Sequence, residues 1–350
     1  MDSFIDNSWR IAAFVFGTSF ALAGCKQREP QVAYPTYQYP AQNPNQYPPG
    51  AQPPPQQQPP PVAQPGQTAV APTVPTPVPP VPAGPDPINQ LDLNFLRNEG
   101  TSILRELVAA LPPLQQGRVA NIPLVVDSTV GEVNAFASCT REGRAAMAIT
   151  DGLLEIQAQL ARARAHDELG GTRKVDEYIQ LIARQQRPKQ PIVRPAPGFF
   201  DARLDNDPRK LARQRELLDE QIAFVLGHEL AHHYLSHLPC TGAGALGAAE
   251  VGRLLSDTIP AFNQPNELAA DISGTNDALT AGARRAGYKF TEGGAMLTMQ
   301  FFSGLDASSP ADIFNFERSH PPPAVRVPVI QQTAAAWRGT GGRGLPYPLF

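Results

Sequence analysis

The stretch "GHELAHHYLSHL", at Gly227–Leu238, contains four of the six histidines of this 350-residue chain. On an α-helix, His228 and His232 lie one turn apart and about 40° from each other around the axis. Glu229 lies beside them, where its carboxylate can accept a proton from a water on the same metal ion. The apolar "AFVL" just before the stretch favours a buried helix. The spacing predicts a metal site with two imidazole ligands and a general base. The alternative is an amphipathic helix whose histidines face the core.

The other two histidines of the stretch point elsewhere if the helix continues. His233 lies about 140° and His237 about 180° from His228 around the axis. Neither can then share an ion with the HExxH pair, so we expect both to be packing or surface residues. Leu238 occupies the position at which a metzincin-type site has its third histidine.

A zinc site of this kind needs a third protein ligand and leaves a fourth position open for water. Glu267, in "PNELAAD", is the candidate for that ligand. Asp271 follows four residues later on the same helical face, where it can accept the outer N–H of a ligand imidazole. Read alone, the two carboxylates fit a solvated acidic face equally well. Together with the HExxH motif they predict one Zn²⁺ per chain, on His228, His232 and Glu267.

Four motifs, taken in order along the chain, resemble those of one protein family. "VNAFA", "GHELAHH", "NELAAD" and "SHPPPAVR" together are similar to the HtpX-type zinc metallopeptidases of family M48. The resemblance covers roughly residues 119–327. Within it, residues 161–215 look like a helical insertion.

The resemblance implies a gluzincin, a peptidase with zinc on the three residues above and with Glu229 as the catalytic base. Glu229 takes the proton of the attacking water and later passes it to the leaving amine. The resemblance also implies that His320 lies near the fourth zinc position, where it steadies the oxyanion or binds zinc in a resting form. Arg326 then braces this loop or pairs with a carboxylate near the site. Judged only by the three prolines beside it, His320 fits a surface turn equally well.

The segment "VNAFA" and a strand at Arg144–Thr150 are expected to form the rim of the cleft. An edge strand in this position pairs with extended substrate through backbone hydrogen bonds. Asn134, Ala135 and Phe136 are therefore the candidate substrate-binding residues. The alternative is a hairpin that serves folding only.

The hydrophobic patterns predict an α+β fold, in which a mostly helical zincin-like domain carries a small sheet at the cleft rim. Ile122–Val126 and Arg144–Thr150 fit strands, joined through "VNAFASC". Helices are expected at residues 91–111, 151–169 (starting on Asp151 as N-cap), 171–186, 207–238, 242–255 and 265–288.

The N-terminus has the features of a lipoprotein signal peptide, predicted at residues 1–24. The apolar run Ile11–Ala23 is shorter than the roughly 20 residues of a membrane-spanning helix and has the length of a signal-peptide core. "LAGC" resembles a bacterial lipobox, in which Cys25 is acylated. The alternative is an amphipathic or buried helix with an incidental cysteine.

Proline and glutamine dominate residues 25–88, which contain more than half of the chain's 39 prolines. Such a composition favours an extended, disordered linker in polyproline II conformation. The alternative is a ligand for a proline-binding module. The metallopeptidase domain is predicted at residues 89–338 and a flexible tail at 339–350.

Two cysteines remain in the mature chain after Cys25. Cys139 follows "NAFA" and Cys240 follows the histidine-rich helix, so each lies next to a predicted element of the site. In an exported protein they predict a disulfide; the alternative is two free thiols.

Composition and motifs together favour an exported, lipid-anchored zinc endopeptidase that acts on envelope polypeptides, misfolded ones among them. The formal charge of −3, without basic blocks, argues against nucleic acid as a partner. Lys26 after the lipidated cysteine favours the outer membrane, facing the periplasm. The alternative function is a binding or assembly factor of the envelope, with zinc structural or the site blocked by His320. The Pro-rich linker could bind an envelope partner.

Overall fold

A computed structural model of the chain describes residues 85–256, 263–306, 314 and 320–344. The predicted signal peptide, Cys25 and the Pro/Gln-rich linker up to residue 84 lie outside the described residues, as does the predicted tail from residue 345.

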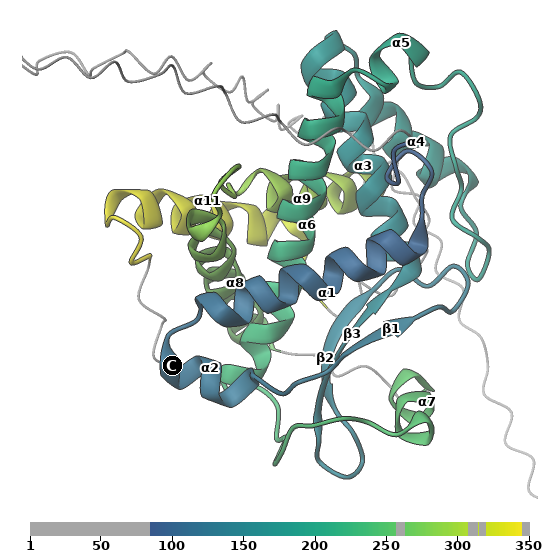
Figure 1. Cartoon of the computed structure of the whole chain (residues 1–350). Coiled ribbons are helices and arrows are strands. Elements are labelled where there is room, and N and C mark those ends of the chain that lie inside the picture. The colour runs from purple at the N-terminus through teal and green to yellow at the C-terminus, as the bar shows by residue number, and fades with distance from the viewer. Residues whose placement is uncertain (1–84, 257–262, 307–313, 315–319, 345–350) are drawn as a thin grey trace, which may run out of the picture. The chain divides into compact units, whose positions relative to one another are not determined.

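The described part of the chain is mostly helical with one small sheet, which confirms the α+β prediction (Figure 1). The strands are β1 (Leu124–Asp127), β2 (Ala135–Cys139) and β3 (Ala145–Thr150). The helices are α1 (Leu93–Ala110), α2 (Pro113–Val119), α3 (Asp151–Gly170), α4 (Lys174–Gln185), α5 (Ala202–Asp205), α6 (Pro208–Tyr234), α7 (Ala248–Ser256), α8 (Gln264–Arg284), α9 (Gly293–Asp306) and α11 (Pro323–Gly339).

The sheet has the strand order β1-β3-β2, with β1 parallel and β2 antiparallel to the central β3. The sequence predicted two strands and treated "VNAFASC" as their connection. That was wrong, because Ala135–Cys139 pairs along its whole length with Ala145–Ile149. The first three residues of β2 are all buried, so the alternation that marks a half-buried strand is missing. β2 forms one edge of the sheet.

Helix α3 follows β3 directly, and Thr150 rather than Asp151 caps it. The Thr150 hydroxyl oxygen accepts the Leu153 N–H at 3.1 Å. Asp151 is the first helical residue, and its carboxylate accepts from the guanidinium of Arg97 at 2.8 and 2.5 Å. The predicted cap was one residue late, because Asp is favoured both at the N-cap and in the first turn.

Helix α6 is the longest described helix and packs against α1, α3, α8 and α9 (Figure 1). Asp207 caps its N-terminus by accepting the Arg209 N–H at 2.9 Å, and Pro208 occupies the first helical position. Every residue from 217 to 232 is buried. A helix that is buried on all sides lies within the core. Neighbouring elements therefore fix the side chains of its second half from several directions.

Helices α6 and α8 approach closely where Gly227 faces Gly274. A Cβ on Gly274 would lie 2.6 Å from the backbone nitrogen of His228, and a Cβ on Gly227 would lie 3.1 Å from the Gly274 carbonyl oxygen. A side chain at position 274 would push the two helices apart, because its Cβ would meet the backbone of α6, which cannot move aside as a flexible side chain can. This close approach brings the carboxylates of α8 beside the histidines of α6.

Helix α7 covers the face of the sheet that points away from the main core. Val125, Phe136 and Ala148 form a second apolar cluster with Leu254 of α7. The adjacent residues of the same strands enter the main core instead, as the alternation of a strand requires.

The range predicted as an insertion, residues 161–215, spans the end of α3, all of α4 and α5, and the start of α6. Its apolar residues, such as Tyr178 and Ile182, enter the same core as the rest of the domain. Its status as an insertion stays a prediction.

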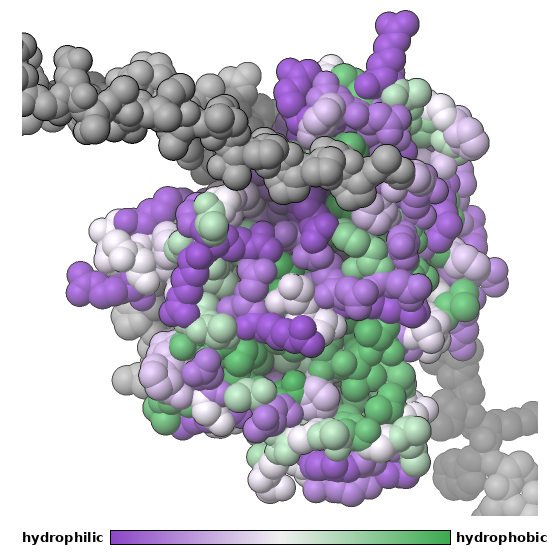
Figure 2. All heavy atoms as spheres, in the orientation of Figure 1, coloured by the Kyte–Doolittle hydropathy of each residue, from purple (hydrophilic) through white to green (hydrophobic). Residues whose placement is uncertain are grey.

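Polar and charged residues cover most of the face seen in Figure 2, and apolar residues gather on its lower part. Leu114 and Val130 are the most exposed large apolar residues of the described chain. None of the described helices combines the length and the apolar character needed to cross a membrane.

Candidate metal centre

Three predicted ligands meet between α6 and α8. His228 and His232 lie on α6 with their Nε2 atoms 3.1 Å apart. Glu267, in the first turn of α8, places Oε2 at 3.4 Å from Nε2 of His228 and Oε1 at 3.4 Å from Nε2 of His232. All three residues are at most 2% exposed. These atoms form a compact group that could hold a metal ion.

The separations between neighbouring ligand atoms are close to those found around a zinc ion. Zinc binds imidazole nitrogen and carboxylate oxygen at about 2.0–2.1 Å, so two ligands of a tetrahedral ion lie about 3.3–3.4 Å apart. The two Nε2 atoms are 3.1 Å apart, and each lies 3.4 Å from a different oxygen of Glu267. Both carboxylate oxygens of Glu267 are buried and accept no hydrogen bond from the described residues. A buried carboxylate without a donor is costly unless it binds a cation, so the donor set fits a divalent metal.

Asp271 and Arg326 support the first of the two imidazoles. His228 donates its Nδ1–H to Asp271 Oδ1 at 3.0 Å, which leaves Nε2 directed at Glu267. Arg326 of α11 donates to both oxygens of the same carboxylate, from Nε at 2.9 Å and from Nη2 at 2.6 Å. All three groups are buried. The structure therefore brings Asp271 to the outer nitrogen of His228, and Arg326 to Asp271.

Glu229 and His320 lie beside the three predicted ligands. Glu229 Oε1 is 3.6 Å from His320 Nε2, which in turn is 3.8 Å from Glu267 Oε2. His228, Glu229 and His320 also form a group whose ligand atoms could share one ion. His320 is thus not an exposed turn residue, since its side chain is only 5% exposed.

Charge at the cluster is set by burial and by close partners. Burial alone would raise the pKa of Asp271, but Arg326 and His228 lower it to about 2. Burial alone would lower the pKa of His228, but the hydrogen-bonded carboxylate of Asp271 and the nearby carboxylate of Glu267 raise it to about 9. Burial lowers the pKa of His232 to about 4.

The two remaining carboxyl groups are also ionised at neutral pH. Burial would raise the pKa of Glu267, but the two histidines of α6 hold it well below its usual range. Burial would likewise raise the pKa of Glu229, but His320 lowers it. The cluster therefore holds carboxylate charge that a divalent cation would neutralise.

Sequence comparison agrees with this geometry. The model of peptidase family M48 matches residues 105–334, about two thirds of the chain, and this range includes the whole histidine–carboxylate cluster. The chain belongs to peptidase family M48. Peptidases of this family are metal-dependent and act on polypeptides. Comparison with curated proteins and with solved structures gave no match.

His237 does not have the position expected for it in this M48 chain. The helix ends at Tyr234, and Ser236 has a left-handed backbone with φ of 62°. The chain turns back there, so that His237 Nδ1 lies 2.9 Å from His232 Nδ1. The angle of 180° applied only to a continuing helix; His237 packs its ring against that of His232 instead of lying across the helix from the cluster.

His233 lies on the opposite side of α6 from the cluster. Its Nε2 lies 3.0 Å from the carbonyl oxygen of Ala146 on β3, within hydrogen-bond distance. This residue therefore packs α6 against the sheet.

The residues predicted at the cleft rim lie at the start of β2. The Asn134 N–H donates to the Thr150 hydroxyl and the Asn134 carbonyl accepts the Thr150 N–H, both at 3.0 Å. The Asn134 side chain is buried, and neither its oxygen nor its nitrogen has a hydrogen-bond partner among the described residues. Ala135 and Phe136 are buried as well.

A disulfide joins Cys139 at the end of β2 to Cys240 after α6, as the sequence predicted. It connects two segments that are 101 residues apart in the sequence. The rim strand is thereby tied to the segment that carries His237.

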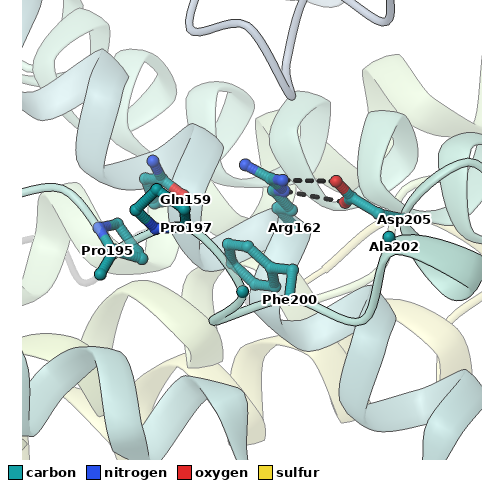
Figure 3. A pocket seen from close by; sticks show the side chains of 9 residues that line it. Gln159, Arg162, Pro195, Pro197, Phe200, Ala202 and Asp205 are labelled. Atoms are coloured by element: carbon teal, nitrogen blue, oxygen red, sulfur yellow. Dashed lines mark hydrogen bonds and ion pairs between the residues drawn. The ribbon is translucent and has the colours of Figure 1, made fainter.

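A separate cavity of about 330 Å³ lies between α3 and the segment before α6, and Figure 3 shows its walls. Arg162 donates to both carboxylate oxygens of Asp205, at 2.9 and 2.5 Å, and Lys210 donates to Asp205 at 2.7 Å. The charged group in the cavity wall is therefore already paired. No residue of the candidate metal centre lines this cavity. The lining residues are Gln159, Arg162, Pro195, Ala196, Pro197, Gly198, Phe200, Ala202 and Asp205.

Proposed function

We propose that this M48 chain is a zinc-dependent endopeptidase, with one zinc ion on His228, His232 and Glu267 and with Glu229 as general base. The observation that carries the proposal is the buried group of two imidazoles and one carboxylate whose ligand atoms lie close enough to share one ion. Glu267 directs one oxygen toward each imidazole, at 3.4 Å in both cases, which supports the same ligand set.

The bound metal supplies a Lewis acid for the peptide carbonyl and for the attacking water. Glu229 accepts the proton of that water and donates it to the leaving amine, a role that requires an ionised carboxylate at the start. The lowered pKa of Glu229 supports this role, since it keeps the group ionised at neutral pH. His320, 3.6 Å from Glu229, donates to the oxyanion of the tetrahedral intermediate.

Substrate backbone is proposed to pair with the edge of β2 that faces away from β3. In an antiparallel pair, the residues that hydrogen-bond to the neighbouring strand alternate with residues that point their N–H and C=O away. Asn134 bonds to Thr150, so Ala135 and Ala137 direct their backbone groups to the opposite edge. Backbone pairing of this kind binds extended peptides of varied sequence. The buried, unpartnered amide of Asn134 is a further group for substrate contact.

The cell envelope is the proposed location. The run before Cys25 has the pattern of a lipoprotein signal peptide, and a disulfide persists mainly in oxidising compartments. We expect the lipid on Cys25 to anchor the domain to the outer membrane and the Pro-rich linker to separate the two. Envelope proteins, misfolded ones in particular, are the proposed substrates. Replacing Cys25 by Ser should move the chain from the membrane fraction to the soluble fraction; retention at the membrane would contradict the anchor.

A second candidate is a gated or non-cleaving member of the fold. The burial of His228, Glu229 and His232 favours it, because substrate reaches such a site only after a movement. In that case zinc is structural, or His320 blocks the site. Glu229 favours the peptidase, since a structural zinc site needs no base beside the ion.

The deciding experiment measures bound zinc and casein cleavage in the same preparations of the mature chain. We expect about one zinc per wild-type chain, cleavage by wild type, and none by Glu229→Gln despite full zinc. Glu267→Ala should lose both zinc and cleavage. Glu177→Gln, an exposed glutamate paired with Lys174, is the matched control and should behave as wild type. Equal casein cleavage by wild type and Glu229→Gln would end the peptidase proposal.

A further inference from the structure

The turn after α6 brings a further histidine, His237, to the cluster. His237 donates its backbone N–H to the His232 carbonyl at 3.0 Å, although the helix has already ended. The left-handed Ser236 makes this reversal, which lays the His237 ring against the His232 ring with centroids 5.0 Å apart. The two Nδ1 atoms are 2.9 Å apart, a hydrogen-bond distance.

The direction of this hydrogen bond follows from the rest of the site. Nε2 of His232 lies 3.1 Å from Nε2 of His228 and 3.4 Å from Glu267. If Nε2 binds the metal it carries no proton, so the single proton of the neutral imidazole is on Nδ1. His232 is then the donor. His237 accepts through Nδ1 and carries its own proton on Nε2.

We propose that His237 is a positioning residue for His232: it accepts the outer N–H of that ligand and so fixes its tautomer and ring orientation. The inference rests on the proposed zinc site. Asp271 does the corresponding work for His228, at 3.0 Å. The two ligands thus have different outer acceptors, a carboxylate for one and a neutral imidazole for the other. Outer acceptors of this kind typically contribute 10–100-fold to metal affinity.

The turn that carries His237 is held at both ends. Arg118 of α2 donates to the Tyr234 carbonyl at 2.7 Å, at the last residue of the helix. Cys240, three residues beyond His237, is joined by the disulfide to Cys139. A short segment fixed on both sides has few conformations, so little entropy is lost when it orders a ligand.

The test measures zinc affinity by competition with a chelator on the mature chain, for wild type and for substitutions of similar size. Asn and Asp place an oxygen where His237 Nδ1 lies, and both accept a hydrogen bond, whereas Leu does not. We expect His237→Leu to bind zinc 10–100-fold more weakly. His237→Asn and His237→Asp should stay within a few-fold of wild type. His233→Asn, which alters a histidine on the far side of the helix, is the control and should bind zinc as wild type does.

Two further measurements separate positioning from general stability. The free energy of unfolding of the metal-free proteins should be similar for His237→Leu and His237→Asn. The visible absorption of the cobalt-substituted site should change in the Leu variant only. Wild-type affinity and an unchanged cobalt spectrum in the Leu variant would overturn the inference, and so would equal losses in the Leu, Asn and Asp variants. If His237→Leu does not fold, weak binding by both the Asn and the Asp variants would still overturn it. Absence of stoichiometric zinc from wild type would instead overturn the proposed function.

Discussion

The pair of Asp271 and Arg326 offers a quantitative test of how the site is built. Arg326 makes two charge-assisted hydrogen bonds to Asp271, and both side chains are almost fully buried. Removing one partner of such a pair leaves a buried charge uncompensated and costs about 3–5 kcal/mol. That is about 10²- to 10⁴-fold in the folding equilibrium. We therefore expect Arg326→Met and Asp271→Asn each to destabilise the metal-free protein by this amount.

The double variant should lose less free energy of unfolding than the two single variants lose when their losses are added. Asp271→Asn with Arg326→Met removes both charges, and the Asn oxygen still accepts the His228 N–H. A double-mutant cycle by urea unfolding at pH 7.5, with chelator present, should give a coupling free energy of about 2–3 kcal/mol. Arg338→Met, at an exposed pair with Glu292, should cost about 0–1 kcal/mol. Additive losses in the cycle would refute the reasoning.

Three further predictions concern residues that support the site without belonging to it: Asp277, the disulfide cysteines and Gly274. Burial raises the pKa of Asp277 to about 7 against 3.8, although the Tyr234 hydroxyl donates to it at 2.7 Å. The folded state therefore binds a proton more tightly than the unfolded state, and stability should fall by up to about 4 kcal/mol as pH rises from about 4 to about 7. Asp277→Asn should abolish that fall in urea titrations; an unchanged pH slope would contradict it. Replacing Cys139 and Cys240 by Ala opens a loop with a sequence separation of 101 and should cost up to about 4.7 kcal/mol in thermal or urea unfolding. An unshifted midpoint would show that the bridge does not constrain the unfolded chain. Gly274→Ala should separate α8 from α6 and reduce zinc binding in chelator competition, whereas Gly252→Ala, in open space, should not. Equal zinc affinity in the two glycine variants would argue that the close contact between α6 and α8 does not set the affinity for zinc.

The six helices expected from the sequence correspond to α1, α3, α4, α6, α7 and α8, because the signals of a helix are local; α2, α5, α9 and α11 were not predicted. At the start of α6, for example, Asp207 is the N-cap and Pro208 the first helical residue. The same reasoning missed β2, whose residues Ala135–Ala137 are all buried between the main core and α7. Burial on both faces removes the alternation from which a strand is recognised. Pairing with β3, which is not a local property, decides this element.

The site divides in the same way. The spacing of His228 and His232 is a helical property, so it could be read directly from the sequence. Glu267 follows His228 by 39 positions, so no helical spacing joins them; it was chosen because zinc needs a third ligand and Asp271 follows it at i+4, and the family resemblance implies the same ligand. His237 was misplaced because the angle calculation continued the helix beyond Tyr234. Pro239, which follows two residues later, is a helix-ending signal that could have corrected the estimate.

The remaining parts of the site depend on contacts between distant segments. Asp271 is 43 residues from His228 in the sequence, and Arg326 is 55 residues from Asp271. His228, the first proposed ligand, therefore meets Asp271 and Arg326 only after α8 and α11 have docked on α6. His232, the second proposed ligand, contacts His237 on a turn that the disulfide ties to β2, across 101 residues. Bringing such distant segments together lowers the conformational entropy of the chain, and folding of the domain must offset this loss before the metal binds. A high-affinity site thus requires the folded domain with its bridge formed, and not the HExxH helix alone.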